Sequence, residues 1–245
     1  MKPILTKTQF LNSYKLKKFA LKSMEKYKIN FPIYGNEDLV KIISFLTFNG
    51  HLYLSEKAFL FTSSLLSELK EIERLVKKEF NLIGKYRKIK SNFGTCYEYR
   101  IISAPISRIL KLLDTPTGSK VKQTFLVPTW IKNNLEFARL YLKIAFDCEG
   151  SIWKEPNRMK IRFKLHKIEE KLENGKLFMK DMKDMLKRFN IETTKTWIIN
   201  GNLRKDGYKT KGLVFDIKTK SLESYKEQIG FNNINKRNKL IKWGR

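Results

Sequence analysis

Residues 142–151 read Leu-Lys-Ile-Ala-Phe-Asp-Cys-Glu-Gly-Ser, and a related run, Ile-Ile-Ser-Phe-Leu-Thr-Phe-Asn-Gly-His, occupies positions 42–51. Each run is apolar around most of a helical circumference, which is typical of a buried helix. Each ends in a polar residue followed by glycine, and a stretch with strand character comes next. The polar residue is the carboxylate Glu149 in the later run and the neutral amide Asn49 in the earlier one. The two runs indicate a duplicated chain.

The same order of elements follows both runs. In the first half, apolar spacing and turn residues predict a helix, a hairpin, a helix, a hairpin and a helix at 39–49, 51–62, 65–80, 82–103 and 105–113. In the second half, the same five elements are expected at 136–149, 151–167, 177–189, about 201–207 and 221–229. The predicted fold class is therefore α+β, with two pseudo-symmetric αββαββα halves.

The boundaries between the halves follow from one shared junction and one connector. The middle helices end in Phe80-Asn81-Leu82 and Phe189-Asn190-Ile191, respectively. The Thr-Pro-Thr-Gly run at 115–118 and the polar residues after it are typical of a connector. We expect a helical extension, a first repeat, a linker and a second repeat at 1–37, 38–114, 115–135 and 136–245.

The charge of the chain is strongly positive along its whole length. Lys and Arg total 51 against 24 Asp and Glu, which gives a net charge of +27. Residues 1–122 carry 23 basic and 10 acidic side chains, and residues 123–245 carry 28 and 14, so a basic tail is excluded as the cause. A lysine-rich genome is one explanation. A polyanionic partner is the leading one, because so positive a surface repels itself, and nucleic acid is the expected polyanion.

Other partners and compartments are weaker candidates. No run reaches the roughly 18 uninterrupted apolar residues of a membrane span, so we expect no membrane insertion. Cys96 and Cys148 lie far apart without metal-ligand spacing, which argues against a disulfide scaffold or a zinc site. We expect an intracellular protein, cytoplasmic or nucleoid-associated, with an organelle left open.

One strand suggests what the sheets contact. Along 158–165, basic and apolar residues alternate, so a period of two places four cations on one face and four apolar groups on the other. We expect the cationic face to meet phosphates. Basic residues also crowd the other hairpins. The candidate nucleic-acid-binding residues are Lys57, Lys85, Arg87, Lys88, Lys90, Arg100, Lys154, Arg158, Lys160, Arg162, Lys164, Lys195, Arg204, Lys205, Lys209 and Lys211.

The chain resembles the two-repeat LAGLIDADG homing endonucleases, especially the archaeal and intein-associated type. The resemblance rests on Y-L-K-I-A-F-D-C-E-G-S-I at 141–152, which is similar to the second motif helix and its exit into a strand. It is supported by V-P-T-W-I at 127–131, R-K-D-G-Y-K-T-K-G at 204–212 and I-G-F at 229–231. The similarity covers about residues 38–241.

The resemblance implies a saddle of two four-stranded antiparallel sheets in the major groove, with the motif helices packed along a pseudo-twofold axis. It also implies a monomer that cuts both strands of a long asymmetric DNA site, with Mg²⁺ or, as a substitute, Mn²⁺. A divalent cation at paired helix ends is chemically reasonable, because helix C-termini carry partial negative charge.

The family's functional residues map onto a few positions. Glu149 and Asn49 occupy the acidic positions, and with Gly50 and Gly150 they are the expected metal ligands. Lys120 and Lys236 occupy the places of the catalytic lysines. Asp147 cannot share the work of Glu149, because two residues of helix turn its side chain to roughly the opposite face.

Two functions follow, and they differ in activity. The first is a site-specific double-strand endonuclease, impaired or biased to one strand because Asn49 contributes no charge. The second is a binding protein with a decayed metal centre, either an intron RNA maturase or a DNA-binding regulator. Nucleophile triads are not credible, since neither His51 nor His166 lies in a serine or cysteine motif.

Overall fold

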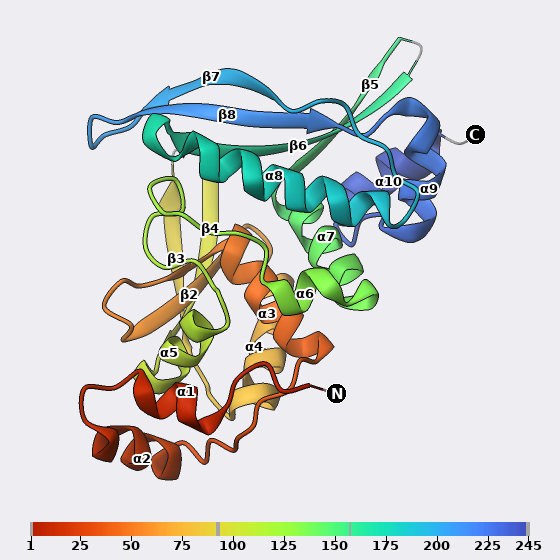
Figure 1. Cartoon of the computed structure of the whole chain (residues 1–245). Helices are drawn as coiled ribbons and strands as arrows, with labels where there is room; N and C mark the ends of the chain where they lie inside the picture. Colours follow the sequence, from red (N-terminus) through yellow and green to blue (C-terminus); the bar gives the residue numbers. More distant parts are fainter. Residues whose placement is uncertain (1, 92–93, 157, 244–245) are drawn as a thin grey trace. The chain divides into compact units, whose positions relative to one another are not determined.

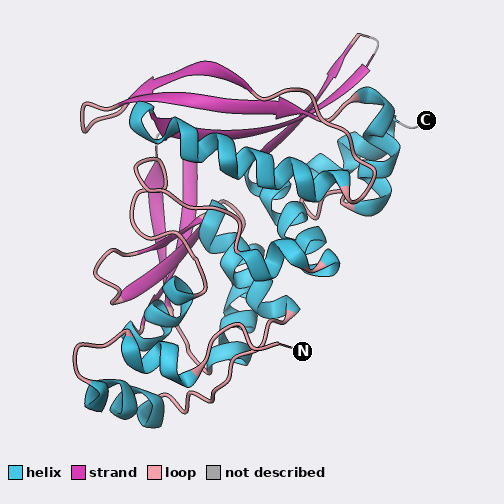
Figure 2. Ribbon diagram, in the orientation of Figure 1, coloured by secondary structure: helices cyan, strands magenta, loops and turns pink. Residues whose placement is uncertain are grey.

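The chain divides into two compact units, Met1–Gly118 and Ser119–Arg245, in a computed structural model that describes residues 2–91, 94–156 and 158–243. Figures 1 and 2 show that each unit combines one sheet with helices. Each sheet has four strands, all neighbours antiparallel, and the orders are β1-β2-β4-β3 and β5-β6-β8-β7. The predicted α+β class is confirmed, and the same topology recurs in both units.

The first unit begins with two short helices that precede the repeated elements. Its elements are α1 (Lys7–Asn12), α2 (Lys17–Lys26), α3 (Glu37–Phe48), β1 (Gly50–Leu52), β2 (Ala58–Ser63), α4 (Leu66–Phe80), β3 (Lys85–Ser91), β4 (Gly94–Ile102) and α5 (Ala104–Leu112). The second hairpin of this half was predicted at 82–103, and the sequence Ser-Asn-Phe-Gly at 91–94 predicts its turn; residues 92 and 93 lie outside the described residues.

The second unit repeats this order and adds elements at both ends. Its elements are α6 (Thr129–Asn133), α7 (Leu135–Glu149), β5 (Gly150–Glu155), β6 (Arg158–Ile168), η1 (Glu169–Lys171), α8 (Leu172–Lys187), β7 (Trp197–Leu203), β8 (Lys209–Asp216), η2 (Thr219–Ser221), α9 (Leu222–Gln228) and α10 (Ile234–Trp243). Helix α10 was not expected from the sequence.

The start of α8 also corrects the prediction, which placed it at residue 177. The helix begins at Leu172 and runs through Asn174-Gly175, two residues that usually break helices. Gly175 has a packing reason to be there, because a Cβ at this position would lie 2.3 Å from Leu213 Cδ1. The small residue therefore lets the helix close onto β8.

Two pairs of matching residues build the same turns in both units. Gly50 and Gly150 follow the motif helices, and a Cβ at either one would lie within 2.8 Å of backbone atoms of the preceding turn, 2.7 Å from Leu46 Cα and 2.4 Å from Phe146 O. Asn81 and Asn190 follow the middle helices with φ of 51° and 59°, the left-handed conformation that asparagine tolerates better than most residues. The junctions found in the sequence are therefore structural.

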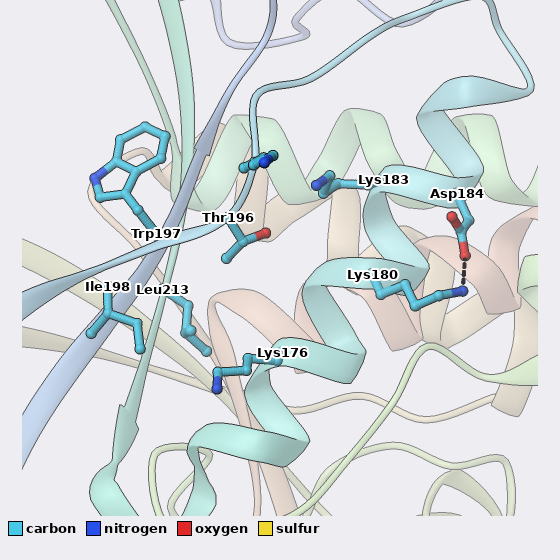
Figure 3. Close-up of a pocket in the computed structure, with 9 residues that line it drawn as sticks. Lys176, Lys180, Lys183, Asp184, Thr196, Trp197, Ile198 and Leu213 are labelled. Carbon is cyan, nitrogen blue, oxygen red and sulfur yellow. Dashed lines mark hydrogen bonds and ion pairs between the residues drawn. The ribbon is translucent and has the colours of Figure 1, made fainter.

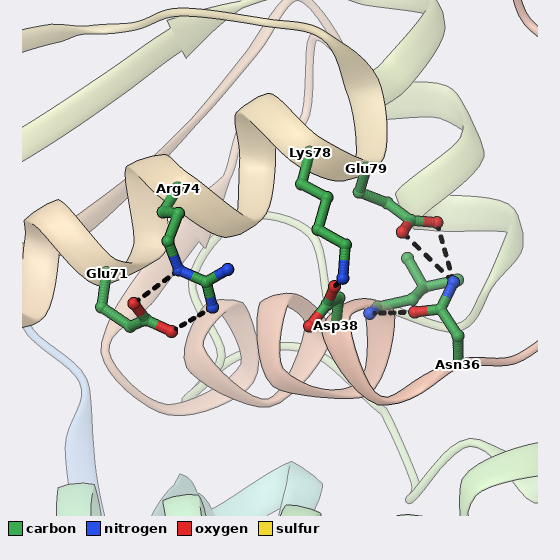
Figure 4. Close-up of polar contacts among 7 residues, drawn as sticks. Asn36, Asp38, Glu71, Arg74, Lys78 and Glu79 are labelled. Carbon is green, nitrogen blue, oxygen red and sulfur yellow. Dashed lines mark hydrogen bonds and ion pairs between the residues drawn. The ribbon is translucent and has the colours of Figure 1, made fainter.

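Polar contacts join α3 and α4 of the first unit along one side (Figure 4). Asn36, the N-cap of α3, accepts from Leu39 N at 2.8 Å and donates to Glu79 Oε1 at 3.1 Å. Lys78 of α4 pairs with Asp38 of α3. These contacts hold the motif helix of the first unit in register with the helix behind its sheet.

The core of the second unit forms where α7 packs on one face of its sheet. Phe146 is fully buried, and its ring centroid lies 5.3 Å from that of Phe163 and 5.2 Å from that of Tyr225. Along β6, Met159, Ile161 and Phe163 are buried at 4%, 0% and 0% exposure, whereas the basic residues between them are partly or fully exposed. The predicted alternation is confirmed. The face away from the helices, called the open face below, carries the four cations of this strand.

Candidate nucleic-acid interface and metal centre

Glu149 is the last residue of the motif helix α7, and the next residue starts β5. Protein atoms crowded around its carboxyl raise its pKa by desolvation, although the residue as a whole is exposed. Three ammonium groups close enough to act through space oppose that shift, and they belong to Lys120, Lys236 and Lys164. The end of α7 therefore holds one carboxylate among three lysines of the same unit, an arrangement that suits a phosphate.

Lys236 closes the C-terminus of α7. Its Nζ donates to Phe146 O at 3.1 Å, to Asp147 O at 2.6 Å and to Gly150 O at 2.6 Å. A cation bound to the last carbonyls of a helix is favourable, because these groups have no partner within the helix and carry partial negative charge. The Gly150 oxygen is therefore engaged by a positively charged donor, and a metal ion there would require Lys236 to move.

Helix α10 delivers Lys236 to this place through Asp147. The Asp147 carboxylate accepts from the backbone N–H groups of Asn232, at 3.0 and 3.1 Å, and of Asn233, at 3.0 Å. The Asn233 side chain then accepts from Lys236 N at 3.2 Å, as an N-cap does. Asp147 thus anchors the start of α10 while Lys236 of α10 closes the end of α7. The sequence analysis did not predict this helix, although Asn233, a cap residue ahead of Ile234, is a signal from which its start could have been found.

Lys120 is held in the second unit by a buried partner. Burial lowers the pKa of the Lys120 ammonium to about 8, and the negative charge of Glu149 opposes that shift. Lys167, which is fully buried, donates from Nζ to Lys120 O at 2.8 Å and to Gln123 O at 2.6 Å. Its Nζ also lies 3.9 Å from the centroid of the Phe125 ring. Sequence reasoning missed Lys167, because nothing in the alternating pattern marks a lysine on the apolar face as buried.

Asn49 and Gly50 lie in the first unit, at the end of α3. Asn49 is the C-cap of this helix, and its carbonyl oxygen accepts from Thr62 N and Thr62 Oγ1, both at 2.9 Å. Its amide side chain is half-buried. Thr47 stands where Asp147 stands in the second unit, and its hydroxyl bonds to Ile43 O of its own helix at 2.8 Å. Thr47 therefore does not repeat the role that Asp147 has in the second unit.

The donor set for a metal is small in this part of the chain. Among the residues the structure describes, no group of three or more His, Cys, Asp and Glu side chains comes together. In the second unit, Glu149 is the hard oxygen donor at the end of α7, and the Gly150 oxygen already has a partner. The described residues of the second unit thus supply one carboxylate and no complete metal cage, a donor set that fits an ion such as Mg²⁺, which usually takes its remaining ligands from water and substrate phosphates.

The candidate nucleic-acid residues do not share one surface. Register places one set on the open faces of the sheets, namely Lys85, Arg87, Arg100, Arg158, Lys160, Arg162 and Lys164. A second set lies on the helix side of its sheet, namely Lys88, Lys90, Lys154, Lys209 and Lys211. The others lie in turns or connections, namely Lys57, Lys195, Arg204 and Lys205.

The reason for the split is the strict alternation of a strand. Tyr86 donates from its hydroxyl to Glu73 of α4 at 3.0 Å, which fixes the helix side of β3. Lys88 and Lys90 follow at even spacing and therefore share that side. The sequence showed a basic hairpin, but which face each cation occupies depends on where the alternation starts.

A groove on the helix side of the second sheet collects further lysines (Figure 3). It has a volume of about 640 Å³ and lies between α8 and the edge strand β7. Its lining includes Lys176, Lys180, Lys183 and Lys195, and Lys180 is paired with Asp184 at 2.7 Å. Figure 3 shows the Trp197 ring turned away from these lysines. Lys195 thus belongs to this groove and not to the open face.

The helices give no sign of a membrane segment: within the described ranges, none combines the length and the apolar character that crossing a bilayer requires.

Comparison with known proteins places the second unit in a family. Residues 136–230 match the LAGLIDADG-like domain. The DNA-directed RNA polymerase subunit Rpo1N of Methanocaldococcus jannaschii is 35% identical over 168 residues, which are 65% of this chain and 12% of that protein. The tRNA-splicing ligase RtcB of Methanopyrus kandleri is 32% identical over 173 residues, 64% of this chain and 17% of the ligase. The chain therefore spans less than a fifth of either relative.

A solved structure shares the fold. The homing endonuclease I-WcaI, bound to its DNA recognition sequence, matches 94% of this chain and 97% of its own with a TM-score of 0.52 and 10% identity. Identity this low supports the fold alone. The domain match, in contrast, spans nearly all of α7, the whole second sheet and helices α8 and α9, so the second unit carries a LAGLIDADG-like domain.

Proposed function

We propose that this protein is a site-specific DNA endonuclease that binds duplex DNA on the open faces of its sheets and hydrolyses phosphodiesters beside its motif helices. The observation that carries the proposal is Glu149, which sits among Lys120, Lys164 and Lys236 at the end of α7. Lys164 belongs to the cationic row of β6, so the carboxylate lies beside the surface that DNA would cover. A phosphate bound along that row reaches the end of α7.

The chemistry would use a divalent cation, Mg²⁺ or Mn²⁺. Glu149 would hold such an ion in the second unit, and Asn49 would offer a neutral oxygen ligand at the matching place of the first unit. Such an ion makes bound water a better nucleophile and stabilises the charge on the leaving oxygen. Lys120 would stabilise the negative charge that builds on the phosphate. Lys236 holds the end of α7 in place through the three carbonyls it binds.

The partial matches support a mobile genetic element. A polymerase subunit and a tRNA-splicing ligase perform unrelated reactions, yet a region of similar size in each resembles this chain and amounts to 12% and 17% of those proteins. The shared region is best explained as an inserted module rather than as part of either enzyme's own machinery. We infer that this chain is such a module, acting as a monomer on a long asymmetric DNA site inside the cell.

The second candidate function is binding without cleavage, and Asn49 favours it. An amide contributes an oxygen ligand but no charge, so a metal beside Asn49 is held more weakly than one beside a carboxylate. The retained open faces would then serve a DNA-binding regulator or a maturase bound to intron RNA.

A strand-resolved cleavage assay separates these functions. The protein is incubated with Mg²⁺ or Mn²⁺ and a DNA library that contains intron or intein insertion sites, and cuts are scored on each strand. The proposal expects cleavage that Glu149→Ala abolishes while DNA binding is nearly unchanged. Asn49→Asp is the matched variant, because it restores the missing acid and should increase cutting of the weaker strand.

Each other outcome has a definite meaning. Cutting of one strand by the natural protein and of both by Asn49→Asp would locate the defect in the first unit. Tight binding without any cut, in the natural protein and in Asn49→Asp alike, would overturn the endonuclease and leave the binding function.

A further inference from the structure

Arg162, on the open face of the second sheet, is held by two aromatic rings and a carboxylate. It lies on the inner strand β6, and its guanidinium carbon is 4.9 Å from the ring centroid of Trp153 on β5 and 5.1 Å from that of Trp197 on β7. The two indoles therefore flank it from the two edge strands. An arginine between aromatic rings gains cation–π stabilisation and loses most of its freedom.

A buried carboxylate fixes the orientation of the same side chain. Arg162 Nε donates to Asp216 Oδ1 at 2.7 Å, and Nη2 donates to Oδ2 at 3.1 Å. The side chain of Asp216 is 5% exposed, and that of Arg162 is 31% exposed. Asp216 is itself anchored, because its backbone N–H donates to Thr194 Oγ1 at 2.9 Å. The pair thus has a buried end and an end that reaches the open face.

The remaining donors point to the kind of partner that fits. A guanidinium has five N–H donors, and Asp216 takes one from Nε and one from Nη2. Both hydrogens of Nη1 and the second of Nη2 are left for an acceptor outside the described residues. A fork of two parallel N–H groups matches the O6 and N7 atoms of guanine in the major groove, the commonest specific arginine contact with DNA.

The groups that hold Arg162, namely Asp216 and the two indole rings, favour contact with a base over contact with a phosphate. A phosphate accepts from a flexible lysine in many orientations, and a carboxylate beside the cation weakens such a contact by cancelling charge. A base edge requires a fixed direction, which is what a bidentate carboxylate and two rings supply. Asp216 therefore weakens a contact of Arg162 with a phosphate and strengthens a contact with a base edge.

We propose that Arg162 is a specificity-determining residue that reads one guanine in the DNA site, with Asp216, Trp153 and Trp197 as its positioning residues. This inference rests on the proposed function, since it needs duplex DNA on the open face. Sequence analysis grouped Arg162 with three phosphate-facing cations of its strand, and the structure separates it from Lys164 by its fixed geometry.

The test measures how strongly the protein discriminates between base pairs at one position of the site, rather than its overall affinity for DNA. The full-length protein selects sites from a randomised duplex library, and binding of the selected site is compared with sites in which one G·C pair is replaced by A·T. The natural protein should select an invariant guanine whose replacement weakens binding roughly 5- to 150-fold. In Arg162→Lys and Arg162→Gln, the ratio of the affinity for the selected site to the affinity for the A·T-replaced site should fall to near one at this position only. Asp216→Asn should lower it as well while the arginine remains.

Lys164→Gln is the matched control from the same strand. It should weaken binding to all sequences alike and leave every ratio unchanged, as loss of a phosphate contact does. The Arg162 inference is overturned if both Arg162 variants behave as this control does, with the selected site intact. If the natural protein selects no sequence at all, the proposed site-specific function fails, and the inference fails with it. Melting curves establish that each variant is folded, and Arg162→Lys keeps the charge.

Discussion

Replacing Lys167 with methionine tests whether a buried lysine anchors the segment that carries Lys120. Lys167 has no exposed surface, and burial lowers the pKa of its ammonium from 10.5 to about 7. In the folded protein the group is therefore largely neutral above pH 7, whereas in the unfolded chain it stays protonated up to about pH 10.5. Between these values unfolding takes up a proton, so the free energy of unfolding rises with pH.

The magnitude follows from the two pKa values. With folded and unfolded pKa values of about 7 and 10.5, the contribution of Lys167 to the free energy of unfolding becomes more favourable by about 2 kcal/mol between pH 7 and pH 9. Lys167→Met removes this slope. The variant also leaves the carbonyls of Lys120 and Gln123 without their donor, which costs roughly 1–3 kcal/mol for each carbonyl that water does not reach.

The assay is urea unfolding of both proteins at pH 7, 8 and 9. The stability of the natural protein relative to Lys167→Met should increase by about 2 kcal/mol over that range, because groups common to both proteins cancel in the difference. Lys205→Met, in an exposed turn, controls for the loss of one positive charge and should show no such trend. A difference that stays constant from pH 7 to 9 refutes the reasoning. It would mean that the two carbonyls and the Phe125 ring keep the ammonium charged despite its burial.

Three further predictions concern the end of α7 and the two charged surfaces. Gly150→Ala should destabilise the protein by about 1–3 kcal/mol in thermal unfolding, since its Cβ would lie 2.4 Å from a backbone oxygen of the preceding turn, and an unchanged melting temperature would contradict this. Asp147→Ala should cost about 1–2 kcal/mol, as loss of an N-cap does, and should reduce cleavage by freeing Lys236, whereas full activity would show that α10 needs no anchor. Lys164→Gln should lower the salt dependence of DNA binding, the slope of log K against log salt, by about one released counterion. Lys183→Gln, in the groove on the helix side of the sheet, should leave that slope unchanged. Equal effects of the two variants would indicate that DNA contacts both faces.

The fold could be predicted from the sequence because its signals are local and occur twice. A buried apolar helix that ends at glycine, and a middle helix that ends at Phe-Asn, each recur in the second half, and the structure gives both a steric reason. The alternation along 158–165 was also visible, since strand residues follow a period of two without help from distant parts of the chain. These features require only neighbours in sequence.

The candidate centre was predictable only in part, because its contacts join distant residues. The sequence pointed to Lys236, but not to the three carbonyls that it binds, since these depend on how α10 packs on α7. Lys167 carries no local mark of burial, and its partners are Lys120 and Gln123, more than forty residues away. Long-range packing decides which lysines of a lysine-rich chain become buried or bind backbone carbonyls.

The two units share the residues that build the fold and differ in the residues to which we assign a role in catalysis. Gly50 and Gly150 solve the same steric problem, so both halves require the same turn. Asn49 and Thr47, in contrast, stand where the second unit has Glu149 and Asp147, and Thr47 bonds to its own helix instead of anchoring another. Under the proposed function, both sheets contribute to DNA recognition, whereas a cut in one strand requires a single working centre. An asymmetry confined to the helix ends is therefore expected to change which strands are cut before it changes where the protein binds.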